Sequence, residues 1–339
     1  MSKKNRLLLL CLFFMACSST EQIVNNLTQN TVKITKAKTI IIKDTIPASD
    51  VVFQMALIGG GTFQMGSPFS EIDRMEDEGP QYTTAVDSFY MGIHEVTFDE
   101  YNIFRNKELD KIPVENPAWK ADAFARPSPP YEDPTFGMGK EGYPAVSMTQ
   151  YAALQYCKWL TEKTGTFYRL PTEVEWEYAC KAGSLTPYYF GDDSNLLDDH
   201  AWYYENSSEK YHKVGSKQPN DWGLYDMLGN VSEWTLDQYQ EDAYTKIATE
   251  MTTEINPWIR PTRLHPRTVR GGSWDDFKAV QRCAARIKSS KKWKERDPQI
   301  PKSFWWNTDS PFVGFRIVRP VKQPSKKEQA DFWLLVLGD

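Results

Sequence analysis

The distribution of apolar residues along the chain predicts short strands and a few helices joined by long loops. Two short apolar runs, 55–58 and 62–65, flank Gly59, Gly60 and Gly61. Such runs around a glycine turn are typical of a β-hairpin, because glycine adopts the backbone angles that tight turns need. Residues 107–144 contain many prolines, which favours one long loop.

Three helix starts are predicted where Ser or Thr is followed three residues later by Glu or Gln. At this spacing the two side chains can each accept a hydrogen bond from a backbone N–H in the first turn. The pairs are Thr97 with Glu100, Ser147 with Gln150, and Thr172 with Glu175. Helical spacing in the second helix also predicts one buried face, made of Ala153, Tyr156, Cys157 and Leu160.

The first residues have the pattern of a bacterial lipoprotein signal peptide. A positively charged start precedes a short apolar run, and Phe14-Met15-Ala16-Cys17 resembles a lipobox. The run is shorter than the roughly 20 apolar residues that span a bilayer. We therefore expect removal of residues 1–16 and lipid attachment to Cys17, which would anchor the protein to a cell-envelope membrane, the outer membrane in particular. The alternative is an ordinary signal peptide that contains a cysteine.

Changes in polarity divide the remaining chain into three parts. Residues 17–50 are rich in Thr, Asn and Lys, which predicts a tether, and the β-branched run 39–42 favours an added edge strand. Residues 51–320 form the predicted main domain. The tail 321–339 is predicted to form an element of its own, because Ser325 can start a helix that ends in the apolar run 332–337. That helix either docks on the chain's own core or binds a partner.

Charge and cysteine content narrow the classes of function. The net charge is −5, and removal of residues 1–16 takes away three cations and no acids, which makes it −8. We expect no nucleic-acid partner, because phosphate backbones favour basic surfaces. Of the five cysteines, Cys11 leaves with the signal peptide and Cys17 carries lipid, so three remain. An odd number in an oxidising compartment predicts one disulfide and one free thiol.

Eight short blocks of sequence carry a family resemblance. They include Arg270-Gly271-Gly272-Ser273-Trp274 and occur in the order 58–67, 77–80, 89–97, 143–147, 169–179, 223–234, 270–274 and 314–316. Together the blocks resemble the sulfatase-modifying factor family, also known as formylglycine-generating enzymes. The resemblance covers residues 51–320 and implies an α+β fold related to C-type lectins, with short strands, few helices and long loops. Fold alone does not carry function, so each site residue needs its own interpretation.

The resemblance draws attention to two cysteines that this chain lacks. In catalytic members, two cysteines between the Gly-Gly-Ser turn and a Cys-Ala-Ala-Arg run bind copper. Between Trp274 and Cys283 this chain has no cysteine. Copper(I) is a soft ion that prefers thiolates, so we expect neither the catalytic pair nor bound copper.

Other family sites are retained in the sequence. The resemblance implies a disulfide between Cys180 and Cys283, and it leaves Cys157 a buried free thiol because Ile317 stands at its partner position. It also implies a Ca²⁺ site. The family loop binds this ion through two side chains and two backbone carbonyls, which match Asp226, Gly229, Val231 and Glu233. The alternative is that Asp226 caps a turn and Glu233 forms a salt bridge.

Aromatic residues near the C-terminal end of the domain suggest a binding cleft. Residues 288–309 look like an insertion at the rim of the family's substrate cleft. The candidate cleft residues are Ser273, Trp274, Trp305, Trp306 and Asn307. Exposed tryptophans could stack on a sugar or grip a peptide, whereas the alternative makes them core aromatics. Ser273 matches a pocket serine of the enzymes and equally suits a turn.

These observations favour a lipid-anchored binding or scaffold protein, similar to gliding-motility lipoproteins that resemble this family. Its expected ligand is a peptide, protein or glycan of the cell envelope. The alternative is an oxidase of the sulfatase-modifying factor type, which generates formylglycine from a cysteine of a target protein.

Overall fold

The computed structural model describes residues 39–111, 126–249 and 255–338, and these residues form one folded unit that begins at Thr39. The predicted signal peptide, Cys17 and most of the predicted tether lie outside the described residues. Within the described residues, no helix has the length and apolar character needed to cross a membrane.

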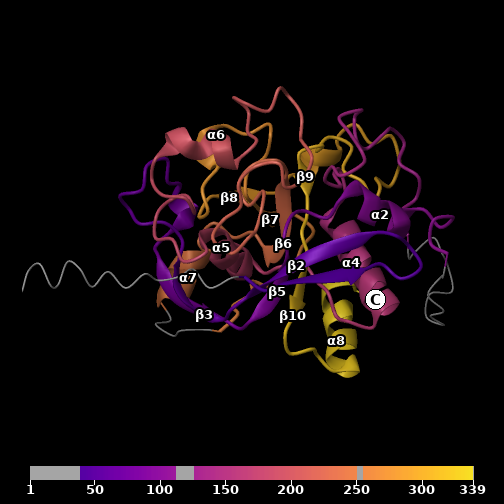
Figure 1. Cartoon of the computed structure of the whole chain (residues 1–339), viewed down its shortest axis with the longest axis horizontal. Coiled ribbons are helices and arrows are strands. Elements are labelled where there is room, and N and C mark those ends of the chain that lie inside the picture. The colour runs from indigo at the N-terminus through magenta and orange to yellow at the C-terminus, as the bar shows by residue number, and fades with distance from the viewer. Residues whose placement is uncertain (1–38, 112–125, 250–254, 339) are drawn as a thin grey trace, which may run out of the picture. The chain divides into compact units, whose positions relative to one another are not determined.

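The strands of the described residues form two four-stranded sheets and a two-stranded ribbon (Figure 1). The first sheet is antiparallel and contains, in spatial order, β1 (Ile41–Thr45), β2 (Val52–Ile58), β5 (Phe89–Gly92) and β10 (Val318–Pro320). The second contains β8 (Arg286–Lys288), β7 (Arg267–Arg270), β6 (Ser232–Gln238) and β9 (Val313–Gly314), with β6 and β9 parallel. The ribbon pairs β3 (Gly61–Met65) with β4 (Tyr82–Val86).

The expected edge strand is present, and because of it the folded unit begins before residue 51. β1 pairs along its whole length with β2, with Ile41 opposite Ala56 and Thr45 opposite Val52. The β-branched residues supply this pairing surface. The folded unit therefore extends to the N-terminal side of residue 51, where the main domain was expected to begin.

The predicted hairpin between β2 and β3 is wrong, because the two strands belong to different sheets. β2 pairs with β5, and β3 pairs with β4. At the crossing, the Gly60 N–H donates a hydrogen bond of 2.9 Å to the Ser88 hydroxyl. A Cβ atom on Gly60 would lie 2.8 Å from the Val86 carbonyl oxygen. The glycine run thus lets the chain pass close to another strand connection instead of reversing on itself.

Helices fill the spaces around the sheets. The α-helices of the described residues are α2 (Phe98–Arg105), α4 (Gln150–Thr164), α5 (Glu173–Lys181), α6 (Leu197–His200), α7 (Ala243–Thr249) and α8 (Lys326–Leu337). The 3₁₀ turns are η1 (Glu76–Glu78), η2 (Ser194–Leu196), η3 (Lys278–Val280) and η4 (Lys291–Lys294). This mixture of short strands, few helices and long loops confirms the predicted α+β fold.

Two of the three predicted helix caps are confirmed. Thr97 and Thr172 each cap a helix with the reciprocal bonds of a capping box. The predicted cap at Ser147 is wrong, because Ser147 has φ +64° and donates its hydroxyl to the Pro134 carbonyl. Thr149 caps α4 instead, since its hydroxyl oxygen accepts a hydrogen bond from the Ala152 N–H at 3.1 Å.

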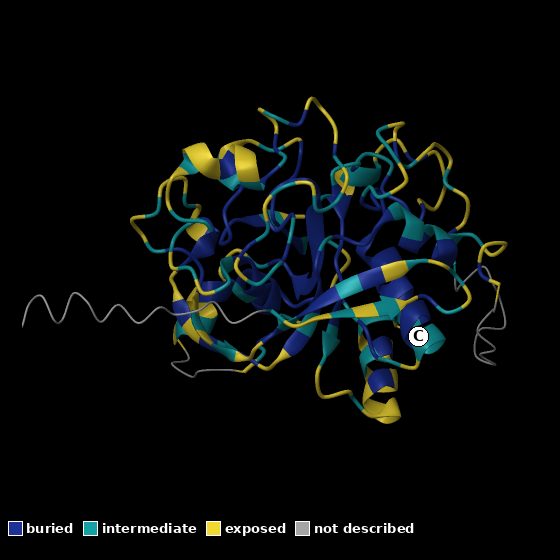
Figure 2. Ribbon diagram, in the orientation of Figure 1, coloured by how far each residue is buried: buried dark blue, intermediate teal, exposed yellow. Residues whose placement is uncertain are grey.

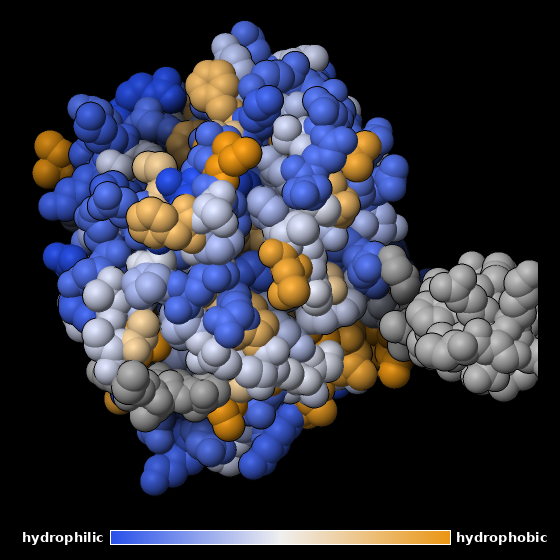
Figure 3. Space-filling view, turned by 90° about the vertical axis from the view of Figure 1, so that its left-hand side faces the viewer, coloured by the Kyte–Doolittle hydropathy of each residue, from blue (hydrophilic) through white to orange (hydrophobic). Residues whose placement is uncertain are grey.

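The buried apolar residues form one large cluster around α4 and another around α5, and both helices contact β6. Every residue of β6 is buried, as are the four residues of the predicted face of α4 (Figure 2). A run buried on both sides is typical of a central strand. On the face shown in Figure 3, by contrast, hydrophilic residues dominate and apolar side chains form scattered patches.

The tail forms the predicted helix and docks on the chain's own core. Ser325 caps α8, and the helix contacts α4. The rings of Phe332 and Trp333 lie 5.3 and 5.5 Å from the ring of Phe167. Leu334 on the outer side is 58% exposed, so the helix covers the core with only part of its surface.

Candidate functional site

The Gly-Gly-Ser turn follows β7 and is held by buried contacts. Arg270, the last residue of β7, is buried and donates hydrogen bonds to the Glu177 carboxylate and the Ala285 carbonyl. Gly271 and Gly272 have φ values of +98° and +70°. A Cβ atom on Gly272 would lie 2.7 Å from the amide of Gln281. The left-handed backbone angle favours glycine at this position, and a larger residue would also have to displace the Gln281 side chain.

Ser273 is a buried member of this turn. Its hydroxyl donates a hydrogen bond of 2.7 Å to the Asp276 carboxylate, and its carbonyl accepts one of 3.1 Å from the Gln281 side chain. Burial raises the pKa of Asp276. Ser273 and Gln281 are fully buried, so the hydroxyl of Ser273 serves the turn and is not exposed in an open cleft.

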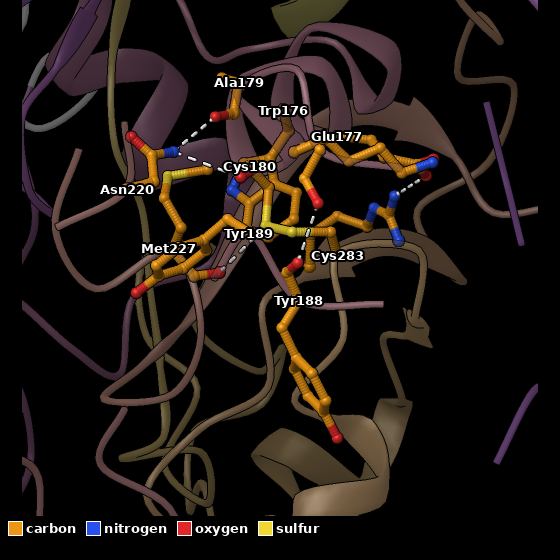
Figure 4. The surroundings of a disulfide bond; sticks show 12 residues. Trp176, Glu177, Ala179, Cys180, Tyr188, Tyr189, Asn220, Met227 and Cys283 are labelled. Carbon is orange, nitrogen blue, oxygen red and sulfur yellow. Dashed lines mark hydrogen bonds and ion pairs between the residues drawn. A yellow bond between two sulfur atoms is a disulfide. The ribbon is translucent and has the colours of Figure 1, made fainter. Parts of the chain in front are cut away.

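The predicted disulfide between Cys180 and Cys283 is confirmed (Figure 4). It ties α5 to the segment that follows the Gly-Gly-Ser turn, across 103 residues of sequence. Asn220 supports it by donating a hydrogen bond of 2.7 Å to the Ala179 carbonyl, next to Cys180. Cys157 is the predicted buried free thiol, and burial raises its pKa.

No thiol lies beside the turn in the described residues. The stretch between Trp274 and Cys283 contains no cysteine, Cys283 is in the disulfide, and Cys157 belongs to the core around α4. A copper(I) ion at this turn would therefore lack the thiolate ligands that it prefers.

The tryptophans do not form the expected exposed platform, and that prediction is wrong. Trp305 and Trp306 are only 7% and 5% exposed. They pack in the core around α4, where Trp305 lies 5.3 Å from the Tyr151 ring and Trp306 donates a hydrogen bond to the Ser128 carbonyl. The alternative interpretation as core aromatics is confirmed.

The other members of the expected cleft are also buried and lie in different surroundings. Trp274 belongs to a small apolar cluster with Val231. The Asn307 amide nitrogen donates a hydrogen bond of 3.3 Å to the Met148 carbonyl, while its Oδ1 atom has no hydrogen-bond partner in the structure. The five expected residues therefore do not converge on one open cleft.

The structure does join the acidic loop to the Gly-Gly-Ser turn. The Gly229 N–H donates a hydrogen bond of 2.9 Å to the Gly271 carbonyl, and the Trp274 N–H donates one to the Asn230 carbonyl. Gly229 has φ +75°, and a Cβ there would lie 2.3 Å from the Trp202 carbonyl oxygen. Two blocks about 40 residues apart in sequence thus form one buried region.

A buried charge cluster underlies this region, and it includes a residue that the sequence interpretation missed. Glu233 accepts hydrogen bonds of 2.6 Å from two nitrogens of Arg316 and one of 2.7 Å from the Trp176 indole. Asp226 accepts a hydrogen bond of 2.6 Å from the Gly215 N–H. Glu95 accepts one of 2.9 Å from the Asn230 side chain. Each of the latter two carboxyl groups keeps one buried oxygen, Asp226 Oδ1 and Glu95 Oε2, without a hydrogen-bond partner.

The electrostatics of the cluster favour an added positive charge. Burial raises the pKa of Asp226 to about 6, against the opposing effects of the Gly215 N–H and Arg316. Burial also raises the pKa of Glu95 well above its usual range, and the charges of Asp226 and Glu233 add to this effect. One guanidinium faces three carboxyl groups, so a proton or a cation would neutralise part of the excess negative charge of the cluster.

The fit to the expected Ca²⁺ site is partial. Asp226 offers a free oxygen, as a hard cation requires, and Glu95 offers a second. Glu233, however, has both oxygens bound to Arg316, so the alternative interpretation of a salt bridge describes this residue. Among the described residues, no group of three or more His, Cys, Asp or Glu side chains has the geometry of a metal site. Calcium binding stays a prediction.

Comparison with known families assigns the fold of this region. The family model described as the sulfatase-modifying factor enzyme 1-like domain matches residues 44–321. The chain belongs to this family. The match confirms the resemblance seen in the eight sequence blocks, and it ends before the helix α8.

The relatives that match this chain are named for different activities. A serine/threonine-protein kinase, pkn1, from Chlamydia pneumoniae is 30% identical over 71% of this chain, but the match spans only 36% of the kinase. The formylglycine-generating enzyme of Mus musculus is 25% identical over 70% of this chain and 71% of the enzyme. The inactive C-alpha-formylglycine-generating enzyme 2 of Bos taurus is 28% identical over 55% of this chain and 71% of that protein.

Among solved structures, PvdO from Pseudomonas aeruginosa is similar over nearly its whole length. It is 25% identical, covers 84% of this chain and 99% of its own, and superposes with a TM-score of 0.63. The family thus includes proteins named as active and as inactive enzymes on one fold, so membership alone does not decide the activity of this chain.

Proposed function

We propose that this protein is a cell-envelope lipoprotein whose sulfatase-modifying factor domain binds a peptide, protein or glycan and does not oxidise a thiol. The observation that carries the proposal is the segment between Trp274 and Cys283. It has no cysteine, and in the structure the adjoining Ser273 and Gln281 are fully buried. A copper oxidase of this family would need thiolates at this position.

The oxidase alternative has a direct test. The purified chain with Cys17→Ser, supplied with copper and oxygen, is incubated with a Cys-x-Pro-x-Arg peptide, and the aldehyde product is sought by mass spectrometry. The formylglycine-generating enzyme of Mus musculus serves as the positive control. We expect no aldehyde from this chain. Aldehyde formation above the copper-only background would refute the proposed function and favour the oxidase.

Lipid anchoring is the second element of the proposal. It rests on the positive start of the chain, the short apolar run and the small residue before Cys17. Metabolic labelling with an alkyne fatty acid should mark the wild-type protein and leave Cys17→Ser unlabelled. Label on the serine variant, or wild-type protein in the soluble fraction without label, would contradict the anchor.

Calcium is proposed as a structural ion of the acidic loop. Asp226 would contribute a carboxylate oxygen, together with backbone carbonyls of the loop, and its unpartnered Oδ1 atom supports this role. A bound divalent cation would offset the buried negative charge of the cluster. Titration calorimetry of chelator-treated protein with Ca²⁺ tests this, with Asp226→Asn as the matched variant that removes the charge.

A further inference from the structure

A cavity of about 350 Å³ lies at the end of β7 that is remote from the Gly-Gly-Ser turn. The start of α4, the segment 261–267, η4 and the end of α8 surround it. This volume falls in the range of small-ligand pockets. Because α8 lies beyond the family match at residue 321, this cavity has a wall that belongs to this chain and not to the shared family domain.

The charged side chains that line the cavity all have the same sign. They are Arg263, Arg267 and Lys294, with His265 beside them, and no Asp or Glu is among the described residues that line it. Arg267 donates a hydrogen bond to the Leu264 carbonyl at 3.3 Å and makes no ion pair in the described structure. Lys294 likewise donates to a backbone carbonyl at 2.8 Å.

Burial disfavours the charges of Arg267 and Lys294. Burial lowers the pKa of Arg267 to about 10. The pKa of His265 falls to about 4, first through burial and then through the charges of Lys294, Arg267 and Lys291. Asp297 offsets part of the charge of Lys294, whose pKa burial still lowers. An anion in the cavity would offset the cost of burying these positive charges.

Part of the cavity lining is apolar. Tyr151, Leu154 and Phe304 line it together with the end of α8. The rings of Tyr151 and Phe304 are 6.3 Å apart, and Phe304 is 64% exposed although it is large and apolar. A ligand here would meet both positive charge and aromatic surface.

Asn307 adds an unpaired hydrogen-bond acceptor. It lines this cavity and a smaller neighbouring one, and its side chain is almost wholly buried. Its amide nitrogen faces the Met148 carbonyl, which fixes the other amide atom as oxygen, and that oxygen has no partner. A buried acceptor without a partner favours a ligand that brings an N–H or O–H group.

We propose that this cavity binds the free C-terminal end of a peptide whose last side chain is apolar. The terminal carboxylate would pair with Arg267 and Lys294, the last amide N–H would donate to Asn307, and the side chain would pack on Tyr151 and Phe304. Arginine suits this role because its planar guanidinium matches a carboxylate with two parallel hydrogen bonds. The inference deepens the proposed binding function, on which it rests, by naming a ligand class and a place.

The first test compares two probes that differ in charge at one end. The full chain is titrated by calorimetry with N-acetyl-Gly-Leu-Phe as the free acid and as the C-terminal amide. We expect the acid to bind and the amide to bind at least roughly tenfold more weakly, because a charge-assisted pair is lost. Equal affinities, or no binding of the acid at millimolar concentration, would overturn the assignment.

Substitutions then place the binding in the cavity. Arg267→Gln should weaken binding of the acid roughly tenfold or more, whereas Lys292→Gln should leave it unchanged. Lys292 is a matched control because it is an exposed cation of the same η4 turn as Lys294 and does not line the cavity. Circular dichroism melts establish that both variants fold. Unchanged affinity in a folded Arg267→Gln variant would refute this site.

Small anions distinguish a peptide end from a free acid. Benzoate and inorganic phosphate should bind more weakly than the peptide acid, because neither supplies the amide N–H for Asn307. Equal or tighter binding of benzoate would indicate that the ligand is a small aromatic acid, and it would overturn the peptide assignment. These titrations are independent of the oxidation assay, since aldehyde formation would refute the proposed function whatever the cavity binds.

Discussion

Replacing Asp226 by asparagine should stabilise this protein at neutral pH when calcium is absent. Asparagine keeps the shape of the side chain, and its oxygen can still accept the hydrogen bond from the Gly215 N–H. Its amide nitrogen can donate to Glu95, whose side chain lies within hydrogen-bonding reach and has one oxygen without a partner. The substitution removes a buried negative charge and supplies a hydrogen bond at the same time.

The magnitude follows from the pKa of Asp226, which burial raises from 3.8 to about 6. Between these two values the folded state holds the proton and the unfolded state does not. The free energy of unfolding therefore falls as pH rises through this window and is level above it. The difference of about two pKa units corresponds to about 3 kcal/mol. Asp226→Asn should recover up to that amount at about pH 7.5 and nothing at about pH 4.

The assay is urea denaturation in a chelating buffer, followed by circular dichroism at several pH values between about 4 and 8. Asp242→Asn is the matched control, because Asp242 is exposed and pairs with Lys246 on the surface. It should leave this pH dependence in place. A less stable Asp226→Asn variant at neutral pH, or a variant with the wild-type pH dependence, would refute the reasoning. Added calcium should stabilise the wild type and not the variant.

Three further outcomes are expected. Removing the disulfide with Cys180→Ser and Cys283→Ser should lower the free energy of unfolding, measured by urea denaturation, by about 4–5 kcal/mol, because the disulfide closes a loop of 103 residues. A loss below about 1 kcal/mol would contradict the entropic reasoning. Trp306→Ala should cost about 3–5 kcal/mol, whereas Phe304→Ala at an exposed ring should cost less than about 1 kcal/mol; similar losses would contradict the assigned burial. Cys157 should resist iodoacetamide in the folded protein and react in denaturant, as mass spectrometry can detect, because burial raises the pKa of its thiol.

Local signals predicted local structure well. The caps at Thr97 and Thr172 were correct because a capping box depends on residues within one helical turn. The cap at Ser147 failed although its spacing was right, because that residue's left-handed backbone follows from contacts with Pro134 and the strand β9. Spacing alone carries no information about such tertiary contacts.

The misassigned and missed residues have the same cause. The glycine run before β3 has the composition of a hairpin turn, but the partner strand β5 lies about thirty residues further along. Glu95 lies in the family block 89–97, but nothing local indicates that its buried carboxyl faces a loop more than 130 residues away. Exposure of Trp305 and Trp306 could not be read from composition, since tryptophan is common both in cores and at binding surfaces.

Each four-stranded sheet contains one strand from the last part of the chain, so neither sheet is complete until that part is in place. β9 and β10 complete the second and first sheets, and Arg316 between them carries the cation that neutralises the buried Glu233. A nascent chain lacking the final segment would leave that carboxylate unpaired and both sheets open at one edge. Chains that lack this segment should therefore be less stable and more sensitive to proteolysis than the full-length protein.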